Sequence, residues 1–226
     1  MSYGLLITCE HAGNNVPEKY KSLFVNSEDI LNSHEGWDPG AWDVANYLGN
    51  HFQVAPIGCH TTRLLIEANR ALDSSQLFSR YSTSLSDSEK RLLIDKIYNP
   101  YRQLVRLNIE KLQKPVLHLS IHSFTPVYDG SERKVEIGLL FDPDRELESH
   151  FCHAYQDTLK LSLPDTNVQF NKPYLGIDDG LTSHLRTIYG NTLYAGIEIE
   201  ISQKFVSDLQ KIKQSLADGL KKVSFP

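Results

Sequence analysis

Residues 5–14 read LLITCEHAGN. The first four residues, Leu5 to Thr8, are apolar or β-branched and predict a buried strand. Glu10, His11 and Gly13 follow almost at once. A strand exit needs only a turn residue such as glycine, so this stretch brings a carboxylate and an imidazole to the edge of the predicted sheet.

Similar apolar runs recur along the chain and alternate with helical patterns. The runs predict strands at 5–8, 52–57, 63–66, 116–121, 137–141 and 193–201, and helices at 40–50, 87–112, 146–161 and 206–223. Ser86 or Asp87 is expected to cap the 87–112 helix, and Pro100 is expected to break or kink it. Alternating strands and helices favour an α/β fold with a largely parallel sheet. The chain contains no repeat, low-complexity linker or charge block, so we expect a single domain over residues 1–226.

Composition excludes several classes of protein. The 226 residues carry a net charge of −5 with the two signs interspersed, which argues against nucleic-acid binding. No apolar stretch approaches the ~20 residues that span a bilayer, and the N-terminus lacks the basic region of a signal peptide. Cys9, Cys59 and Cys152 are odd in number and share no metal-type spacing. We therefore expect a cytoplasmic protein with reduced thiols that binds neither nucleic acid nor membrane.

Polar side chains follow or interrupt several of the apolar runs. Glu10 and His11 follow the first run, His122 follows the run 116–121, and Glu198 and Glu200 share one face of the last. Open α/β sheets bind ligands beyond the carboxyl ends of their strands. Histidines and carboxylates gathered there suit zinc with a water on an open position, and a nearby Glu can take the proton of that water.

Each of these residues also has a plainer interpretation. His11 could simply be exposed, and Glu198 and Glu200 could form structural ion pairs with Arg63 or Arg186. His118 is expected to be a satisfied core histidine or to support the site from behind. By spacing alone the metal site is a suggestion, because the sequence has no HExxH or paired CxxC motif.

The stretch TTRLLIEANRALD, residues 61–73, contains a second polar cluster. Arg63 stands at the start of its apolar run, and Asn69 and Arg70 follow that run. An arginine fork binds a carboxylate through two hydrogen bonds, and an adjacent amide can hold another oxygen. The cluster is either a carboxylate anchor for an acidic or amino-acid substrate or a set of surface ion pairs, as we expect for Arg80 and Arg102.

The order of these motifs resembles one enzyme family. They are CEHAGNNVP, HEGWDPGAWDVA, TRLLIEANR, HLSIHSFTPVYDG, EIGLLFDP, NKPYLGIDDGLTSHLR and YAGIEIEISQ. Together, from about Leu5 to Phe205, they resemble the N-formylglutamate amidohydrolases, in particular the formylglutamate-amidohydrolase-like branch. That family is similar in fold to the zinc carboxypeptidases and the aspartoacylase group. The resemblance implies a phosphorylase/hydrolase-like three-layer α/β/α sandwich around a mostly parallel mixed sheet, and hydrolysis of N-formyl-L-glutamate to formate and glutamate.

The resemblance also implies roles for individual residues. His11 matches the histidine of the family's first strand-end motif, and His122 matches the histidine that follows the central strand. Glu200 matches the acid on the last strand, where the relatives place the general base. Asn69 and Arg70 match the pair that holds the substrate carboxylate in aspartoacylase-like relatives. Asp38, in HEGWDPGA, matches an aspartate that could be a further metal ligand.

The chain departs from the family pattern in three places. Glu10 stands where typical members have proline, Asn14 stands where the carboxypeptidases have their glutamate ligand, and Glu67 with Ala68 replaces the Asp-Leu of an Asp-Leu-Asn-Arg run. Glu10 and Asp38 therefore compete as the third protein ligand. Substrate preference could have drifted from formylglutamate.

The resulting hypothesis is a metal-dependent amidohydrolase that cleaves an N-acyl amino acid. A zinc-like divalent ion would be held by His11, His122 and either Asp38 or Glu10, with Glu200 as general base. The substrate carboxylate would be clamped by Arg70, with help from Asn69, Arg63 and Arg186. The loop NKPYLGIDDGLTS, residues 171–183, could close over the site.

Three alternatives remain open from the sequence. The first is a deacylase, peptidase or other hydrolase that acts on a different acyl group. The second is a binding protein for an acidic metabolite that has lost its metal. The third is a stable α/β domain whose polar strand ends merely satisfy one another.

Overall fold

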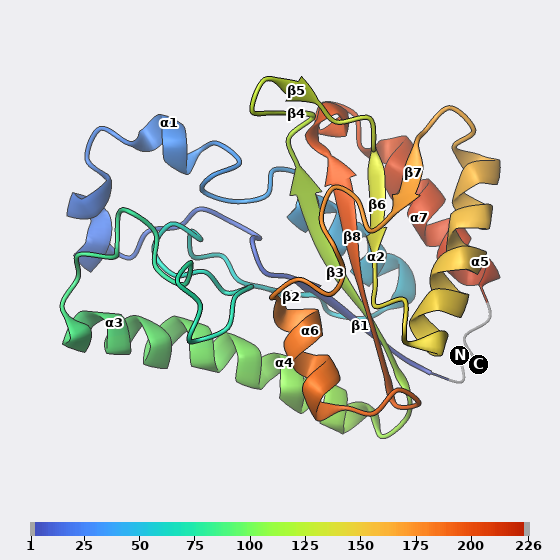
Figure 1. Cartoon of the computed structure of the whole chain (residues 1–226), viewed down its shortest axis with the longest axis horizontal. Helices are drawn as coiled ribbons and strands as arrows, with labels where there is room; N and C mark the ends of the chain where they lie inside the picture. Colours follow the sequence, from blue (N-terminus) through green and yellow to red (C-terminus); the bar gives the residue numbers. More distant parts are fainter. Residues whose placement is uncertain (1–2, 224–226) are drawn as a thin grey trace.

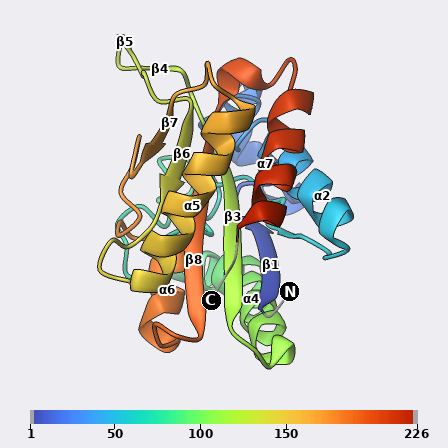
Figure 2. The same ribbon diagram turned by 90° about the vertical axis from the view of Figure 1, so that its right-hand side faces the viewer.

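The computed structural model of the chain describes residues 3–223 and contains a mixed six-stranded sheet with helices on both faces (Figures 1 and 2). The strand order is β2-β1-β3-β8-β6-β7, and every neighbouring pair is parallel except β6 with β8. The predicted α/β sandwich with a mostly parallel mixed sheet is confirmed. The strands of this sheet are β1 (Gly4–Cys9), β2 (Ile57–Gly58), β3 (Val116–Phe124), β6 (Ile137–Leu140), β7 (Val168–Phe170) and β8 (Tyr194–Ser202).

Helices and a small hairpin connect these strands. The α-helices are α1 (Glu28–Leu31), α2 (Ala41–Phe52), α3 (Asp87–Leu93), α4 (Asn99–Leu112), α5 (Glu146–Ser162), α6 (Leu181–Ile188) and α7 (Gln210–Lys222). Short 3-10 or π segments lie at η1 (Glu18–Phe24), η2 (Ile94–Tyr98) and η3 (Gln203–Phe205). The antiparallel pair β4 (Val127–Tyr128) and β5 (Ser131–Glu132) stands apart from the main sheet. No helix within residues 3–223 is both long and apolar enough to cross a bilayer.

The central strands separate an apolar face from a polar one. In β3 the odd-numbered Leu117, Leu119 and Ile121 join the large core cluster, whereas His118 and His122 alternate with them. The residues of β8 alternate in the same way, with isoleucines toward the large core and glutamates on the opposite face. Because the apolar face belongs entirely to the core, any chemistry of the sheet must lie on the polar face.

The two faces are covered by different helices. Helices α2, α5 and α7 contribute buried residues to the core on the apolar face; in Figure 2, α5 lies in front of the strands and α7 and α2 lie to their right. Helices α4 and α6 pack on the other face through a smaller cluster that includes Val105, Ile109, Leu181 and Leu185. This second layer does not reach the carboxyl ends of β1, β3 and β8 with apolar side chains, so polar groups occupy that region.

A third apolar cluster lies beyond the sheet. It joins η1 and α3 to the coil around residues 64–77, to the left of the sheet in Figure 1. Leu65 and Ile66 are completely buried in it. This cluster supports the segment that carries Arg63, Asn69 and Arg70.

Several predicted boundaries are wrong for identifiable reasons. Residues 63–66 form turns in the third cluster, because an apolar run buried by loops looks like a strand in the sequence. Residues 52–57 contribute only Ile57 to a strand, since α2 continues to Phe52. The apolar and helical patterns of the sequence also do not predict β7 or α6.

The long helix at 87–112 forms without a break. Ser86 caps it with a capping box, as expected. Pro100 does not interrupt the helix, because the wide turn of η2 precedes it, with the Asn99 N–H bonded to the Ile94 carbonyl. Pro100 lies in the first turn of α4, where its missing N–H costs little.

Candidate active site

Three side chains that could ligate a metal converge at the carboxyl end of the sheet. Nδ1 of His11 lies 3.2 Å from Oδ2 of Asp38, and Nδ1 of His122 lies 3.0 Å from the same oxygen. One ligand atom from each residue lies within 4.8 Å of the others. The two imidazole rings are 5.1 Å apart between centroids. Segments more than a hundred positions apart therefore meet at one point, and within residues 3–223 no other such triad occurs.

The backbone fixes the three side chains relative to one another. His11 follows β1, His122 lies within β3, and β1 and β3 are adjacent parallel strands. Asp38 comes from the turn before α2, where its N–H donates to the His11 carbonyl at 3.1 Å. The Ser123 N–H donates to Asp38 Oδ2 at 3.3 Å. Gly40 ends the turn with φ 84°, a conformation that glycine adopts without strain.

Behind His122 lies a fully buried carboxylate, Glu10. Its Oε2 is 2.8 Å from His122 Nε2, on the side of the ring away from Asp38. Tyr101 donates to Oε1 at 2.6 Å, and Ser120 donates to Oε2. Glu10 therefore holds His122 from behind, and Asp38 is the acid that lies between the two Nδ1 atoms.

Behind His11 lies a second carboxylate, Glu67. Its Oε1 is 2.5 Å from His11 Nε2, and its Oε2 accepts from the Arg63 guanidinium at 2.7 Å. Arg63 Nη1 also lies 3.4 Å from Oδ1 of Asp38. Each histidine thus has one glutamate at Nε2 and shares Asp38 at Nδ1.

Charge and burial oppose each other in this network, and charge prevails. Burial alone would raise the pKa of each acid, but His11 and His122 hold the pKa of Asp38 well below its usual range. The pKa values of Glu10 and Glu67 are lowered in the same way, by His122 and by Arg63 with His11. Burial also opposes protonation of the histidines, yet the surrounding carboxylates raise the pKa of both rings. The carboxylates are therefore ionised and ready to accept hydrogen bonds or a cation.

Glu200 contributes an unpaired carboxylate to the same place. It pairs with His122 in the register between β3 and β8, so the two side chains lie side by side on the polar face. Glu200 is 5% exposed, and its Oε2 has no hydrogen-bond partner among the described residues. Burial raises the pKa of Glu200 to about 7. A buried carboxylate oxygen without a partner is costly, so this atom is arranged for a ligand.

These residues fit a divalent metal. Two imidazole nitrogens and one carboxylate oxygen form a donor set typical of catalytic zinc with an open position. Metal-bound histidines normally donate their other N–H to a carboxylate, and Glu10 and Glu67 stand where that requires. The unpartnered Oε2 of Glu200 supplies a proton acceptor beside the triad. The geometry can therefore accommodate metal-assisted hydrolysis.

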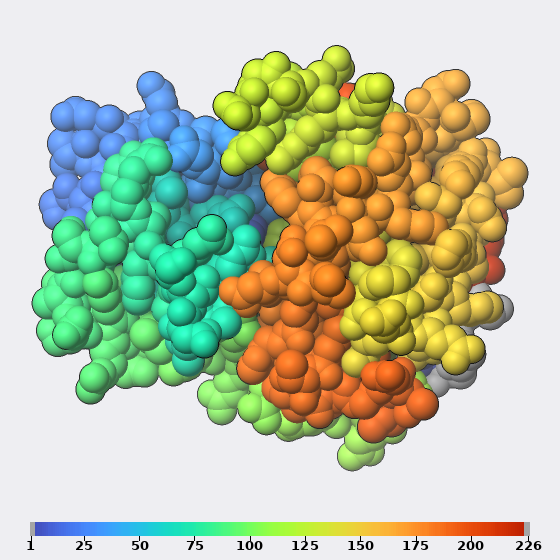
Figure 3. Space-filling view, viewed as in Figure 1, coloured from blue at the N-terminus to red at the C-terminus, as the bar shows by residue number. Residues whose placement is uncertain are grey.

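The triad opens into a cavity of about 160 Å³. Asn69, Arg70 and Arg63 line it together with Glu198 and the loop residues Tyr174, Leu175, Asp178 and Asp179. Figure 3 shows the orange segment that includes this loop meeting a teal segment below the yellow-green hairpin. Arg70 Nη1 donates to the Asp179 carbonyl at 2.8 Å, which joins the two walls. Residues predicted to bind metal and residues predicted to bind a carboxylate therefore share one cavity.

Arg102 holds the Asn69–Arg70 segment in place. We expected Arg102 to form a surface ion pair, and this expectation is wrong, because the side chain is buried. Its guanidinium donates to the carbonyls of Ala68 and Arg70. Arg80, in contrast, forms the expected exposed pair with Glu35. A backbone turn with several carbonyls pointing inward needs a buried cation, and the sequence does not reveal that turn.

Arg186 lies outside the cavity. Its Nε donates to Glu148 at 3.0 Å, and its other nitrogens donate to the carbonyls of Gly176 and Gly196. Glu148 is completely buried and is also paired with Arg145. The structure brings Arg63, Asn69 and Arg70 to the triad, but it uses Arg186 to join α6 to α5 and β8.

Two acids near the triad, Glu67 and Glu198, are not predicted as site residues from the sequence. Glu67 stands out in the sequence only as a departure from the family pattern, and Glu198 only as a structural ion-pair candidate. Glu198 lines the cavity and accepts from Thr182 Oγ1 at 2.6 Å. Its place two residues before Glu200 on one strand face is the available signal, whereas nothing in the sequence places Glu67 behind His11.

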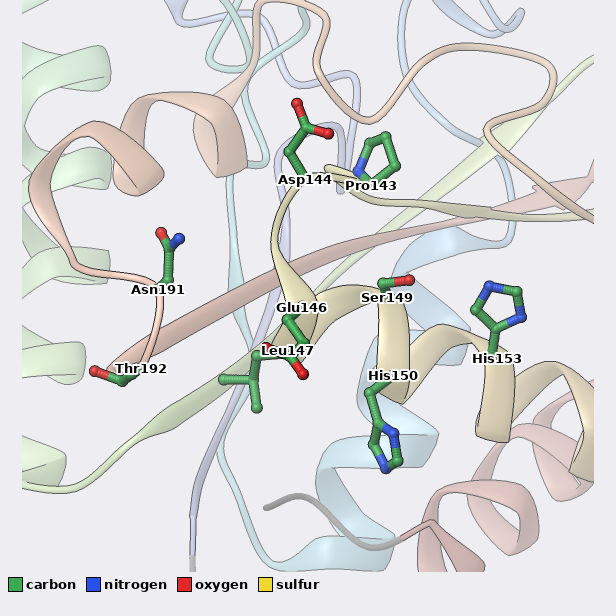
Figure 4. A pocket seen from close by; sticks show the side chains of 9 residues that line it. All are labelled: Pro143, Asp144, Glu146, Leu147, Ser149, His150, His153, Asn191 and Thr192. Atoms are coloured by element: carbon green, nitrogen blue, oxygen red, sulfur yellow. The ribbon is translucent and has the colours of Figure 1, made fainter.

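A larger and more open cleft lies elsewhere, at the start of α5. It measures about 1060 Å³ and is lined by Asp144, Glu146, His150, His153 and the Asn191–Thr192 loop, among others. Figure 4 shows His150 and His153 pointing in different directions from the helix. Its polar side chains do not converge, so size alone does not make this cleft the reaction site.

Three comparisons relate the chain to known proteins. The model of the N-formylglutamate amidohydrolase family matches residues 3–207. Among solved structures, the chain is similar to the product of the gene Atu2144 from Agrobacterium tumefaciens. The TM-score is 0.80 and the identity 27%, over 97% of this chain and 91% of that one. A metallo-carboxypeptidase from Burkholderia cenocepacia is a distant match, with TM-score 0.43 and 10% identity over 98% of this chain and 56% of that one. A search of curated proteins finds no significant match.

Proposed function

The chain belongs to the N-formylglutamate amidohydrolase family, and we propose that it is a metal-dependent amidohydrolase that cleaves the amide of an N-acyl amino acid. One observation carries the proposal. His11 Nδ1, His122 Nδ1 and Asp38 Oδ2 converge beside the buried, unpartnered carboxylate oxygen of Glu200. Ligands and base come from separate elements, so packing alone does not explain their meeting.

His11, His122 and Asp38 would hold the metal, and zinc suits this donor set. When bound there, a divalent ion polarises an amide carbonyl and lowers the pKa of a water. Glu10 and Glu67 accept the Nε2 protons of the two histidines, so that each Nδ1 lone pair faces the shared position. Glu10 therefore supports a ligand in this proposal, and Asp38 is the third ligand.

Glu200 acts as the general base. It accepts a proton from the attacking water and delivers this proton to the amine nitrogen that leaves. Its position next to His122 across the β3–β8 pair places the carboxylate within the cavity. Proton transfer by a positioned carboxylate contributes about 10²- to 10⁴-fold to the rate.

Arg70 and Asn69 bind the carboxylate of the substrate. Asn69 is held by the Leu181 N–H at 2.7 Å, and Arg70 is held by the loop carbonyl of Asp179. The loop 171–183 forms one wall and excludes water from the reacting amide. We place this enzyme, as one domain, in the cytoplasm, which fits its three buried cysteines without disulfides.

The test begins with metal content and turnover. The purified protein is stripped of metal, reloaded with zinc, and assayed with N-formyl-L-glutamate and a panel of other N-acyl amino acids. We expect about one tightly bound ion per chain and hydrolysis that depends on it. Asp38→Asn, which preserves the side-chain size, should lose both.

Two other outcomes identify the rival functions. Turnover only with acyl groups other than formyl would indicate a different deacylase or a peptidase. Tight binding of an acidic metabolite, without bound metal and without turnover, would identify a binding protein and overturn the proposal.

A further inference from the structure

The cavity beside the triad is lined by several carboxylates and by two arginines. Besides Asp38, four acids line it: Asp178, Asp179, Glu198 and Glu200. The arginines are Arg63 and Arg70, and the remaining positive charge belongs to His11 and His122 or to the metal that they would hold. A substrate carboxylate that lies away from the triad therefore depends on the two arginines, which bears directly on which amino acid the enzyme accepts.

One of the two arginines is already occupied. Nε and Nη2 of Arg63 both lie 2.7 Å from Oε2 of Glu67, and Nη1 lies 3.4 Å from Oδ1 of Asp38. This guanidinium therefore neutralises the two carboxylates next to it. It has little capacity left for a substrate.

The other arginine, Arg70, has only part of its guanidinium free to bind a substrate. Nε of Arg70 donates to Gln76, and Nη1 donates to the carbonyls of Asn69 and Asp179. Nη2 makes no hydrogen bond to any of the described residues. Arg70, with the neighbouring amide of Asn69, can thus hold one carboxylate, and among residues 3–223 no other arginine or lysine lines the cavity with donors free for a second one.

Glu198 faces the same space with a free oxygen. Its Oε1 accepts from Thr182 Oγ1 at 2.6 Å, and no cation pairs with it within the described part of the chain. Gly180 brings the loop close to it, since a Cβ there would lie 3.2 Å from both Glu198 Oε1 and Asn69 Oδ1. Glu198 therefore stands next to the amide that would bind the substrate carboxylate.

We propose that the preferred substrate carries one carboxylate, bound by Arg70 and Asn69, and a cationic or N–H-rich group that is bound by Glu198. The inference rests on the proposed amidohydrolase function and narrows its substrate class to N-acyl derivatives of basic or amide amino acids. The buried, unpartnered oxygen of Glu200 marks the same cavity as a ligand site. A second carboxylate, such as that of N-formylglutamate, would face Glu198 without a cation to neutralise it, and like-charge contacts are strongly unfavourable in a small cavity.

The experiment compares three substrates of similar length. The zinc-loaded enzyme is assayed with the Nα-formyl derivatives of L-lysine, L-glutamine and L-glutamate. We expect kcat/KM to be at least about 10-fold higher for the lysine and glutamine compounds than for the glutamate compound. A preference for N-formylglutamate over its glutamine counterpart would overturn the inference.

Two variants separate the roles of the cavity residues. Glu198→Gln should raise kcat/KM for the glutamate compound and lower it for the lysine compound. Arg70→Gln should weaken all three alike, because all three share the carboxylate. An unchanged order of preference in Glu198→Gln would contradict the assignment of Glu198.

A binding measurement keeps the inference distinct from the proposed function. If none of the compounds is hydrolysed, the amidohydrolase proposal fails, but calorimetry with the same three compounds still measures their dissociation constants. Tighter binding of the lysine compound than of the glutamate compound supports the charge preference, and the reverse order overturns it. The same measurement on wild-type protein decides the question if Glu198→Gln does not fold.

Discussion

His118 and His122 lie four residues apart on β3 and point to the same face of the sheet, yet their surroundings are opposite. His118 sits between two hydroxyls, with Thr8 Oγ1 and Tyr194 Oη each 2.7 Å from a ring nitrogen. His122 sits between carboxylates, with Glu10 at Nε2 and Asp38 at Nδ1. As the sequence suggested, His118 is a buried and satisfied core histidine.

The difference shows that neighbouring strands decide what a histidine can do. Burial lowers the pKa of His118 to about 4, so the ring stays neutral in the core. Carboxylates raise the pKa of His122 in spite of the same burial. In the β3–β8 register His118 faces Gly196, whereas His122 faces Glu200. A side chain on an adjacent strand, rather than the histidine itself, thus separates a structural position from a reactive one.

The same substitution at both positions gives the most direct test of the difference between the two histidines. His122→Gln should lose the metal and reduce kcat/KM by more than the about 100-fold that outer-sphere changes cost. His118→Gln, which keeps one donor and one acceptor, should keep the metal. Metal content by mass spectrometry and turnover of an N-formyl amino acid check both variants. Retention of metal by His122→Gln would show that the two histidines are equivalent.

Glu200 lies beside His122, whereas the corresponding neighbour of His118 is Gly196. Glu200→Gln should lower kcat by about 10²- to 10⁴-fold while leaving the metal content unchanged, since it removes the proton acceptor and no ligand. Steady-state kinetics on the zinc-loaded variant provide the measurement. Activity within a few-fold of wild type would remove Glu200 from the role of base.

His118 should make the protein sensitive to acid. Its pKa falls from the ordinary 6.5 to about 4 on folding. The unfolded chain therefore binds a proton at a higher pH than the folded one does. Its contribution is fully present above pH 6.5 and is lost as the pH falls toward 4. The difference, 6.5 − 4 = 2.5 pH units, corresponds to about 3 kcal/mol of unfolding free energy.

Urea unfolding of wild type and His118→Gln between pH 7 and pH 4.5 isolates this contribution. The variant should lack the part of the decline that His118 causes, and the carboxylates of the active site are common to both proteins. Parallel pH curves for the two proteins would show that His118 does not carry the effect.

The smallest expected effects come from the glutamates behind the two metal-facing histidines. Glu10→Gln and Glu67→Gln should each weaken metal binding by about 10- to 100-fold, because the carboxylates orient the rings and increase their basicity. Thr8→Val, which removes the hydroxyl at Nε2 of His118, is the matched control and should leave metal affinity unchanged. Competition with a fluorescent zinc chelator measures all three. Equal affinities across the set would mean that the outer carboxylates have no part in holding the ligands.

Strand ends predicted from the sequence locate much of the site. Glu10, His11, His122 and Glu200 follow or interrupt apolar runs, and all four lie at the carboxyl end of the sheet. The sequence could not choose between Glu10 and Asp38, because it does not show that Asp38 reaches Nδ1 of both histidines whereas Glu10 reaches only Nε2 of His122. The position of Glu10 is set by Tyr101 of α4 and Ser120 of β3, which both donate to its carboxylate.

The roles of the arginines, in contrast, could not be predicted from the sequence. Four arginines look alike in the sequence but have different roles in the structure. Arg63 pairs with Glu67, and Arg70 faces the cavity. Arg102 holds a backbone turn, and Arg186 joins two helices to a strand. A guanidinium has five donors and a long, flexible stem. Its role is therefore fixed by whichever acceptors the fold places within reach, and local sequence does not specify these.

The sequence by itself determined the class of fold and the face of the sheet that carries chemistry, because the period-two alternation of strands is a local property. It also identified the family through the order of its motifs. Only the tertiary structure decided that Asp38 completes the triad, that Glu67 and Glu10 lie behind the histidines, and that Glu198 faces the substrate cavity. The contacts of Asp38, Glu67 and Glu10 with the two histidines join residues from 27 positions apart, for Asp38 and His11, to more than a hundred, for Glu10 and His122. Such separations are closed by the packing of the whole sheet and its helices.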